Sequence, residues 1–250
     1  VATIADWKAM SDAAKSGLGV SQGVTKMLNN AADMVVEEFD EEVASAPSAV
    51  GGGDATLAAR MGDCAMFCMQ CEQTSQGRGC NKVGVCGKTP RVAALQDLTI
   101  NSLKALGFYA HELRELGAVS DKVNRFTLYA LFSTLTNVNF DEQRFVQILR
   151  ELQTLTTTAK SDYEALCASR GVAAKAPAVS ALPEPLPNVD GLVELGRAVG
   201  VLKRFGDATT QSAAGVSEML VYGIKGIAAY ADHSLMNRRE LPEIYAFIHK

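Results

Sequence analysis

The chain has 250 residues, a hydrophobic fraction of 48% and a formal net charge of −4. This acidic balance lacks the positive field with which nucleic-acid binders and polybasic membrane proteins attract their partners, so we expect neither nucleic acid nor membrane as a partner. No apolar run reaches the roughly 18 residues that a membrane span requires. The length and apolar content also allow a large hydrophobic core that needs no disulfide framework.

Residues 1–63 differ in composition from the rest, being rich in Ala, Ser, Gly and acidic residues. We expect two modest amphipathic helices, around Ala5 to Lys15 and around Ala31 to Ala44. A glycine-rich stretch at 46–54 then predicts a flexible joint. The segment is acidic, unlike an organelle transit peptide. We therefore interpret 1–63 as an acidic N-terminal extension and linker.

Residues 64–89 form a cysteine-rich loop that holds five of the six cysteines. Four of them are spaced C-x2-C-x8-C-x5-C and offer convergent thiolates for a soft metal centre: Cys68, Cys71, Cys80 and Cys86. Such clustering indicates metal binding in a reducing compartment rather than a distributed disulfide scaffold. We expect Cys64 and Cys167 to be bystanders, and the nearby basic residues, Lys88 among them, to be ordinary surface charge.

Iron-sulfur and structural zinc sites both use four cysteines. Zinc ribbons usually repeat a tight C-x2-C knuckle, whereas only one such pair occurs here. The spacing therefore favours an iron-sulfur cluster, and a non-catalytic helical module with a four-cysteine zinc site remains the alternative.

Residues 90–171 predict a first helical bundle. Thr89-Pro90 is typical of a helix N-terminus, and apolar residues follow at helical spacing up to Gly117. A second helix is expected over 121–135. A third is expected to start at Asn139 with a capping box to Glu142 and to stop at Gly171.

Residues 172–190 predict a proline-rich linker, because four prolines break any helix there. Residues 191–250 predict the start of a second, incomplete bundle, with helices over 192–202 and 211–235 and another beginning at 241. The segments 103–110 and 224–231 resemble each other, and we expect their tyrosines, Tyr109 and Tyr230, to pack in the core. With no strand-like alternation, the expected fold class is mainly α, a cysteine loop followed by two helical bundles, the second truncated.

The cysteine motif resembles a known family. Phe67-Cys68-Met69-Gln70-Cys71-Glu72-Gln73-Thr74, followed by Gly84-Val85-Cys86-Gly87-Lys88-Thr89-Pro90, is similar to the N-terminal part of the hybrid cluster proteins, also called prismane proteins or hydroxylamine reductases. Residues 194–197, 222–233 and 243–247 resemble the same family, so the likeness covers about 66–250.

The resemblance implies that Cys68, Cys71, Cys80 and Cys86 bind a 4Fe-4S cluster, which passes electrons to a second, hybrid iron-sulfur-oxygen cluster. The ligands of that second cluster are expected only in later domains, so this chain holds no catalytic residue. It would then be a piece of an oxidoreductase that reduces hydroxylamine to ammonia, or related nitrogen oxides, and would be inactive alone. Relatives usually begin close to the first cysteine, so the extension at 1–63 suggests a eukaryotic or fusion context.

The same resemblance implies a redox donor such as a ferredoxin or a flavoprotein reductase, together with the missing C-terminal domains of the same protein. The expected location is the cytoplasm, or an organelle matrix or stroma in a eukaryote. We assign no site role to His111, His233 or His249. The sequence also lacks a phosphate-binding loop, a nucleophile elbow and an HExxH pattern.

Overall fold

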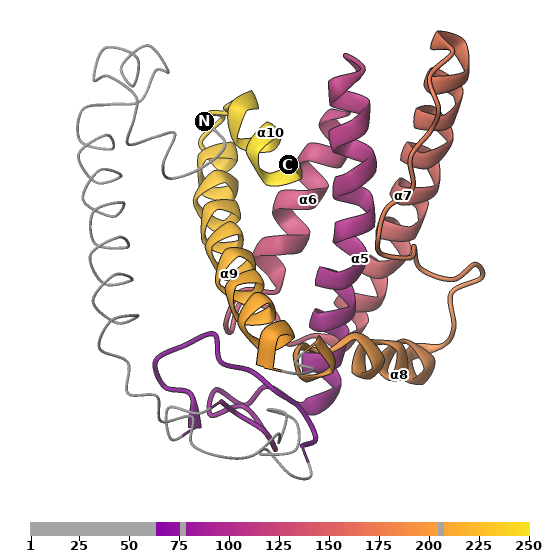
Figure 1. Ribbon diagram of the computed structural model, residues 1–250. Coiled ribbons are helices and arrows are strands. Elements are labelled where there is room, and N and C mark those ends of the chain that lie inside the picture. Colours follow the sequence, from indigo (N-terminus) through magenta and orange to yellow (C-terminus); the bar gives the residue numbers. More distant parts are fainter. Residues whose placement is uncertain (1–63, 76–78, 205–207) are drawn as a thin grey trace. The chain divides into compact units, whose positions relative to one another are not determined.

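The computed structural model describes residues 64–75, 79–204 and 208–250 of the chain, with side chains in the last range from residue 213 onward (Figure 1). The two helices and the flexible joint predicted within 1–63 lie outside the described residues. All the described residues belong to one compact unit.

The described part of the chain is mainly helical, as predicted. They form α5 (Pro90–Glu115), α6 (Asp121–Ser133), α7 (Glu142–Arg170), α8 (Val189–Val199), a short 3-10 helix η2 (Val201–Arg204), α9 (Ala208–Met236) and α10 (Pro242–His249). The only β pairing among them is an isolated antiparallel bridge between Cys68 and Cys80. The mainly α fold class with a cysteine-rich loop ahead of the helices is therefore confirmed.

Helix α5 begins where the sequence predicted. The hydroxyl oxygen of Thr89 accepts a hydrogen bond from the Val92 N–H, and Pro90 occupies the first turn, where its missing N–H costs nothing. At the other end, Gly117 takes a positive φ of 75°, which ends the helix. The cysteine loop is thus joined directly to the first turn of α5.

Helix α5 lies in the middle of the described helices, between α7 and the α6/α9 side (Figure 1), and also packs against α8 and α10. Leu95 and Leu106 of α5 have no exposed surface. Three side chains of α7 are equally buried: Phe145, Leu149 and Leu152. Each such side chain contributes about 1.5–3 kcal/mol through burial. This packing holds α5, whose first turn follows directly after the cysteine loop, in place.

The third predicted helix starts differently from the expectation. The residue that caps α7 is Asp141, whose carboxylate accepts from the Gln143 N–H, while Asn139 accepts from the Asp141 N–H. The capping box from Asn139 to Glu142 is therefore wrong, because an Asx turn shifts the helix start by two residues. The C-terminal stop at Gly171 is confirmed, with a left-handed φ of 66°.

One hydrophobic core continues across the proline-rich stretch. Residues 172–188 form no helix, and α8 then begins at Val189 with Asn188 as its cap. Leu192 and Val193 of α8, Ala228 of α9 and Tyr245 of α10 join the same buried cluster as α5 and α7. The division of the chain into two bundles at 172–190 stays a prediction.

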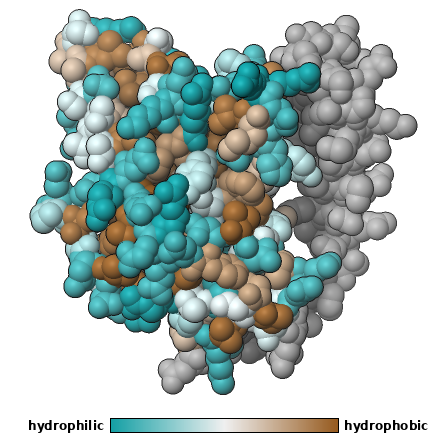
Figure 2. Space-filling model, turned by 180° about the vertical axis from the view of Figure 1, so that it is seen from behind, coloured by the Kyte–Doolittle hydropathy of each residue, from teal (hydrophilic) through white to brown (hydrophobic). Residues whose placement is uncertain are grey.

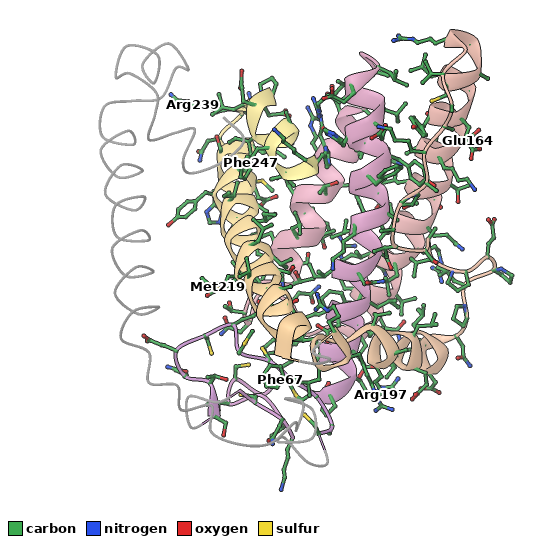
Figure 3. The ribbon with its side chains drawn as sticks, in the orientation of Figure 1. Phe67, Glu164, Arg197, Met219, Arg239 and Phe247 are labelled. Carbon is green, nitrogen blue, oxygen red and sulfur yellow. The ribbon has the colours of Figure 1, made fainter. Side chains whose placement is uncertain are left out.

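The two similar segments differ in their burial. Tyr109 on α5 is 6% exposed, as expected, but Tyr230 on α9 is 81% exposed, so the prediction that it packs in the core is wrong. Helix α9 also exposes Met219 and α10 exposes Phe247, both labelled in Figure 3. The opposite view, Figure 2, shows apolar and polar side chains mixed over one face. Among the described residues, no helix is long and apolar enough to cross a bilayer.

Candidate metal centre

The cysteine loop is held together by backbone pairing around Cys68 and Cys80. The Cys68 N–H donates to the Cys80 carbonyl (3.1 Å) and the Cys80 N–H donates back (2.8 Å). The N–H groups of Ala65 and Met66 both donate to the Asn81 carbonyl, which extends the pairing by one step. Two of the four predicted ligands, twelve residues apart in sequence, are thereby brought side by side.

A glycine makes this pairing possible. Gly79 has a φ of +112°, which L side chains rarely adopt, and a Cβ there would overlap the ring of Phe67. Phe67 itself is 8% exposed and lies where the loop meets the helices (Figure 3). The aromatic ring and the glycine together set the position of Cys80.

The Cys80 sulfur lies in an environment that favours a thiolate. Burial raises the pKa of this thiol, but hydrogen bonds to Val85 and Ser75 backbone groups, the Thr74 hydroxyl 3.7 Å away and the positive charge of Lys88 together hold the pKa below its ordinary value. Backbone donors aimed at a sulfur are a usual feature of cysteine-ligated clusters.

The other two predicted ligands, Cys71 and Cys86, are exposed. Cys71 starts a turn in which its carbonyl accepts from the Thr74 N–H. Cys86 lies in a tight turn closed by a 2.8 Å hydrogen bond from the Gly84 N–H to the Lys88 carbonyl. A Cβ on Gly84 would come within 3.1 Å of the Cys86 sulfur, so glycine leaves the thiol room there.

The structure brings Cys68 and Cys80 together, but it does not close the full quartet. All four are free thiols, and no group of three or more His, Cys, Asp or Glu side chains in the described ranges has the arrangement of a metal site. The donor set of four thiols in one loop, two of them on paired segments, with donors aimed at the Cys80 sulfur, fits a soft metal centre. Ligation by all four stays a prediction.

The remaining cysteines lie apart from this pairing. The Cys64 thiol donates to the Met66 carbonyl (2.6 Å), and burial raises its pKa, so it favours the neutral form. Cys167 is 2% exposed within α7, far along the chain from the loop. Both placements agree with their interpretation as bystanders.

A group of buried charges beneath the loop was missed by sequence reasoning. Lys88 was predicted to be surface charge, yet it is 1% exposed and its Nζ donates to the Cys68 sulfur at 3.6 Å. Lys225 of α9 is 5% exposed and donates to the Thr134 carbonyl (3.4 Å). For Lys225, the sequence offered one signal of burial: a charged residue in a helical stretch that is otherwise apolar.

Lys225 lines a small cavity of about 40 Å³ together with Cys68, Asp97, Arg204 and Glu218. Lys88 does not line this cavity, but its charge acts on Asp97. Burial raises the pKa of Asp97 to about 7, although Lys225 and Arg204 oppose the shift. Burial lowers the pKa of Lys225 to about 8, against the pull of Asp97. The two groups form a weakly solvated acid-base pair close to a predicted ligand.

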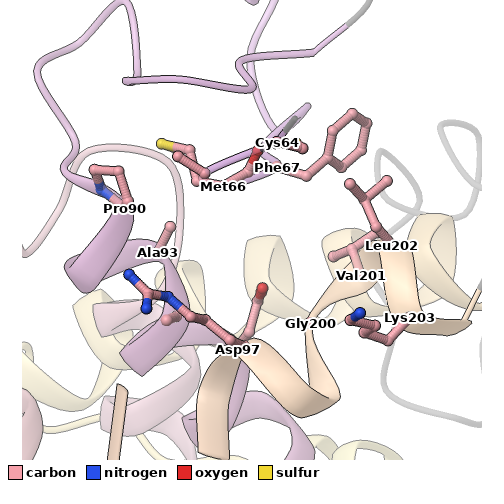
Figure 4. A pocket seen from close by; sticks show the side chains of 13 residues that line it. Cys64, Met66, Phe67, Pro90, Ala93, Asp97, Gly200, Val201, Leu202 and Lys203 are labelled. Carbon is pink, nitrogen blue, oxygen red and sulfur yellow. Dashed lines mark hydrogen bonds between the residues drawn. The ribbon is translucent and has the colours of Figure 1, made fainter. Parts of the chain in front are cut away.

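A larger cavity of about 470 Å³ also adjoins the loop (Figure 4). Met66 and Phe67 line it from the loop, Asp97 from α5, and Gly200 and Lys203 from the segment after α8. Because Asp97 lines both cavities, its carboxylate lies between the open space and the buried charges.

Comparisons with known proteins agree on one family. The model of the Prismane/CO dehydrogenase family matches residues 66–250. Curated hydroxylamine reductases of Rhodospirillum rubrum and Geobacter sulfurreducens are 42% and 43% identical to the chain over 187 and 188 residues, and that of Methanocella arvoryzae is 40% identical over 184 residues.

Each match covers 74% of this chain but only 33–34% of the relative. The chain thus spans about a third of the length of the curated relatives it matches. The family match includes all four cysteines of the motif and every described helix. The chain therefore belongs to the Prismane/CO dehydrogenase family.

Proposed function

We propose that this chain supplies the N-terminal electron-transfer region of a hydroxylamine reductase-like oxidoreductase. Cys68, Cys71, Cys80 and Cys86 would hold a 4Fe-4S cluster, which supplies one-electron transfer when bound. The observation that carries the proposal is the environment of Cys80, whose backbone is paired with that of Cys68 and whose sulfur receives several hydrogen-bond donors that favour a thiolate. The names of the relatives support the reaction class.

In the whole protein, hydroxylamine would take up two electrons and two protons and yield ammonia and water. A ferredoxin or flavoprotein reductase would donate the electrons. The groups that bind hydroxylamine, and the hybrid cluster, would belong to further domains of the kind found in the remaining two-thirds of the relatives. The exposed apolar residues of α9, such as Met219 and Met236, favour coverage by such domains. Alone, this chain should bind its cluster and lack reductase activity.

Anaerobic reconstitution with iron and sulfide tests the proposal. We expect a brown protein with about four irons and matching sulfide per chain, whose visible absorbance falls on reduction with dithionite. Cys80→Ser should lose most of the iron, because a serine hydroxyl is a poor ligand for the cluster. Cys64→Ala should load normally.

A colourless protein that binds zinc in place of iron and sulfide would overturn the proposal and support the alternative, a non-catalytic module with structural zinc. Equal iron content in Cys80→Ser and Cys64→Ala would exclude the assigned ligand set.

A further inference from the structure

Lys88 is buried in a way that is unusual for a lysine. It is 1% exposed, and the described residues give its ammonium a single hydrogen-bond partner, the Cys68 sulfur 3.6 Å away. Burial of an ammonium is strongly unfavourable unless an anionic partner compensates for the lost hydration. Negative charge on the Cys68 sulfur therefore favours this position, together with that of Asp97, on which the charge of Lys88 also acts.

The backbone holds Lys88 in this position. Its carbonyl closes the turn by accepting from Gly84, and the next residue, Thr89, caps α5. A Cβ on Gly84 would come within 2.9 Å of the Lys88 Cβ, so the turn closes tightly around the lysine stem. The ammonium is thus placed before any metal binds, and little rotamer entropy remains to be lost.

Two lysines act on the Cys68 sulfur: Lys225 through its charge alone, and Lys88 through its charge and a hydrogen bond. Around the small cavity, Arg204 is paired with Glu218 at 2.5 Å, and Asp97 lies opposite Lys225. Each described carboxylate there already faces a cation. Lys88 lies outside the lining of that cavity; its charge also acts on Asp97, and its ammonium donates its hydrogen bond to the Cys68 sulfur.

We propose that Lys88 is a positioning residue whose fixed positive charge raises the reduction potential of the centre held by Cys68. The proposal rests on the proposed function. Reduction adds one electron, which dithionite supplies. The negative charge on the ligand sulfurs therefore grows beside an unchanged cation, which stabilises the reduced form.

The test compares reconstituted wild type with Lys88→Met, Lys88→Gln and Lys88→Arg. Lys82→Met is the matched control, because Lys82 lies in the same loop but is exposed. Iron and sulfide are measured first, and the midpoint potential is then measured by a mediated dithionite titration.

In the neutral variants we expect the reduction equilibrium to weaken at least tenfold, which is a shift of about 59 mV to more negative potential for a one-electron couple. Lys88→Arg and Lys82→Met should stay close to wild type.

A loaded neutral variant with an unchanged potential would overturn the inference and leave the proposed function intact. If both neutral variants fail to load while Lys88→Arg loads at the wild-type potential, the charge is needed for binding as well, which supports the inference. Failure of Lys88→Arg to load, with Lys82→Met loading normally, would mean that only the shape of the lysine matters and would overturn it. A wild-type chain without iron would overturn the proposed function itself.

Discussion

Gly196 of α8 lies directly against the backbone carbonyl of Ala94 in α5, so closely that a Cβ on Gly196 would overlap that carbonyl. The contact lets the two helix backbones approach at the base of the cysteine loop, where Ala93 and Ala94 also line the larger cavity. A residue without a side chain thus decides how α8 and η2 are placed against α5.

Replacing Gly196 by alanine should destabilise the protein by about 2–3 kcal/mol, because the added methyl must push α8 away from α5. Urea unfolding followed by circular dichroism measures this. The matched control is Gly107→Ala in α5, where a Cβ would meet nothing within 4 Å. That change should stabilise by up to about 1 kcal/mol. Equal effects of the two substitutions would contradict the contact.

We predict that the protein loses stability in mild acid because buried His249 resists protonation in the folded state. Burial lowers its pKa to about 4, and its Nε2 lies 3.0 Å from the Thr127 hydroxyl. The unfolded chain takes up this proton at an ordinary pKa of about 6.5, so stability is retained above that value and lost as the pH falls towards 4.

Between pH 7 and pH 5, wild type should therefore lose about 2 kcal/mol more of its unfolding free energy than His249→Gln, which cannot be protonated. Urea unfolding at the two pH values gives the comparison. Parallel losses in both proteins would show that His249 is not the group responsible.

We predict that the effect of removing Lys225 on the unfolding free energy depends on pH, because Asp97 lies close to Lys225. At pH 5, Asp97, with a pKa of about 7, is protonated while Lys225 is a buried cation, so Lys225→Met removes a penalty. At pH 8, Asp97 in wild type is ionised beside a Lys225 that is about half charged, and the variant leaves that carboxylate without its cation.

The stability of Lys225→Met relative to wild type should thus fall from pH 5 to pH 8, by on the order of 2 kcal/mol. Urea midpoints at both pH values measure the change. Adding Asp97→Asn should abolish the difference, and a pH-independent effect in the single variant would argue against the pairing.

Thr89 ends the cysteine loop, and its hydroxyl caps the N-terminus of α5. Thr89→Ala should lower the unfolding free energy by about 1 kcal/mol, because the Val92 N–H loses its partner. Thr89→Ser keeps the hydroxyl and should stay close to wild type. Thermal unfolding of the two variants checks the prediction, and matching melting temperatures would contradict it.

Features that depend on neighbouring residues in the chain could be predicted from the sequence. The cap at Thr89, the stop at Gly171 and the apolar spacing of α5 and α7 all follow from local backbone preferences and helical periodicity. The cysteine spacing likewise pointed to a soft metal centre and to the family. The prediction that Asn139 caps α7 was wrong because Asn139 and Asp141, two residues apart, can both accept a hydrogen bond from a backbone N–H. The local sequence pattern does not show which of the two begins the helix.

Other features were decided by packing between distant segments. Lys88 is buried although its neighbours resemble a surface loop, Tyr230 is exposed although its segment resembles that of buried Tyr109, and Gly196 meets a carbonyl about a hundred residues earlier in the chain. Hydrophobic periodicity predicts which face of a helix is buried. It does not predict which segment covers that face or which charged side chains become buried with it. The meeting of Cys68, Lys88, Asp97 and Lys225 therefore depends on how the loop, α5 and α9 are folded onto one another.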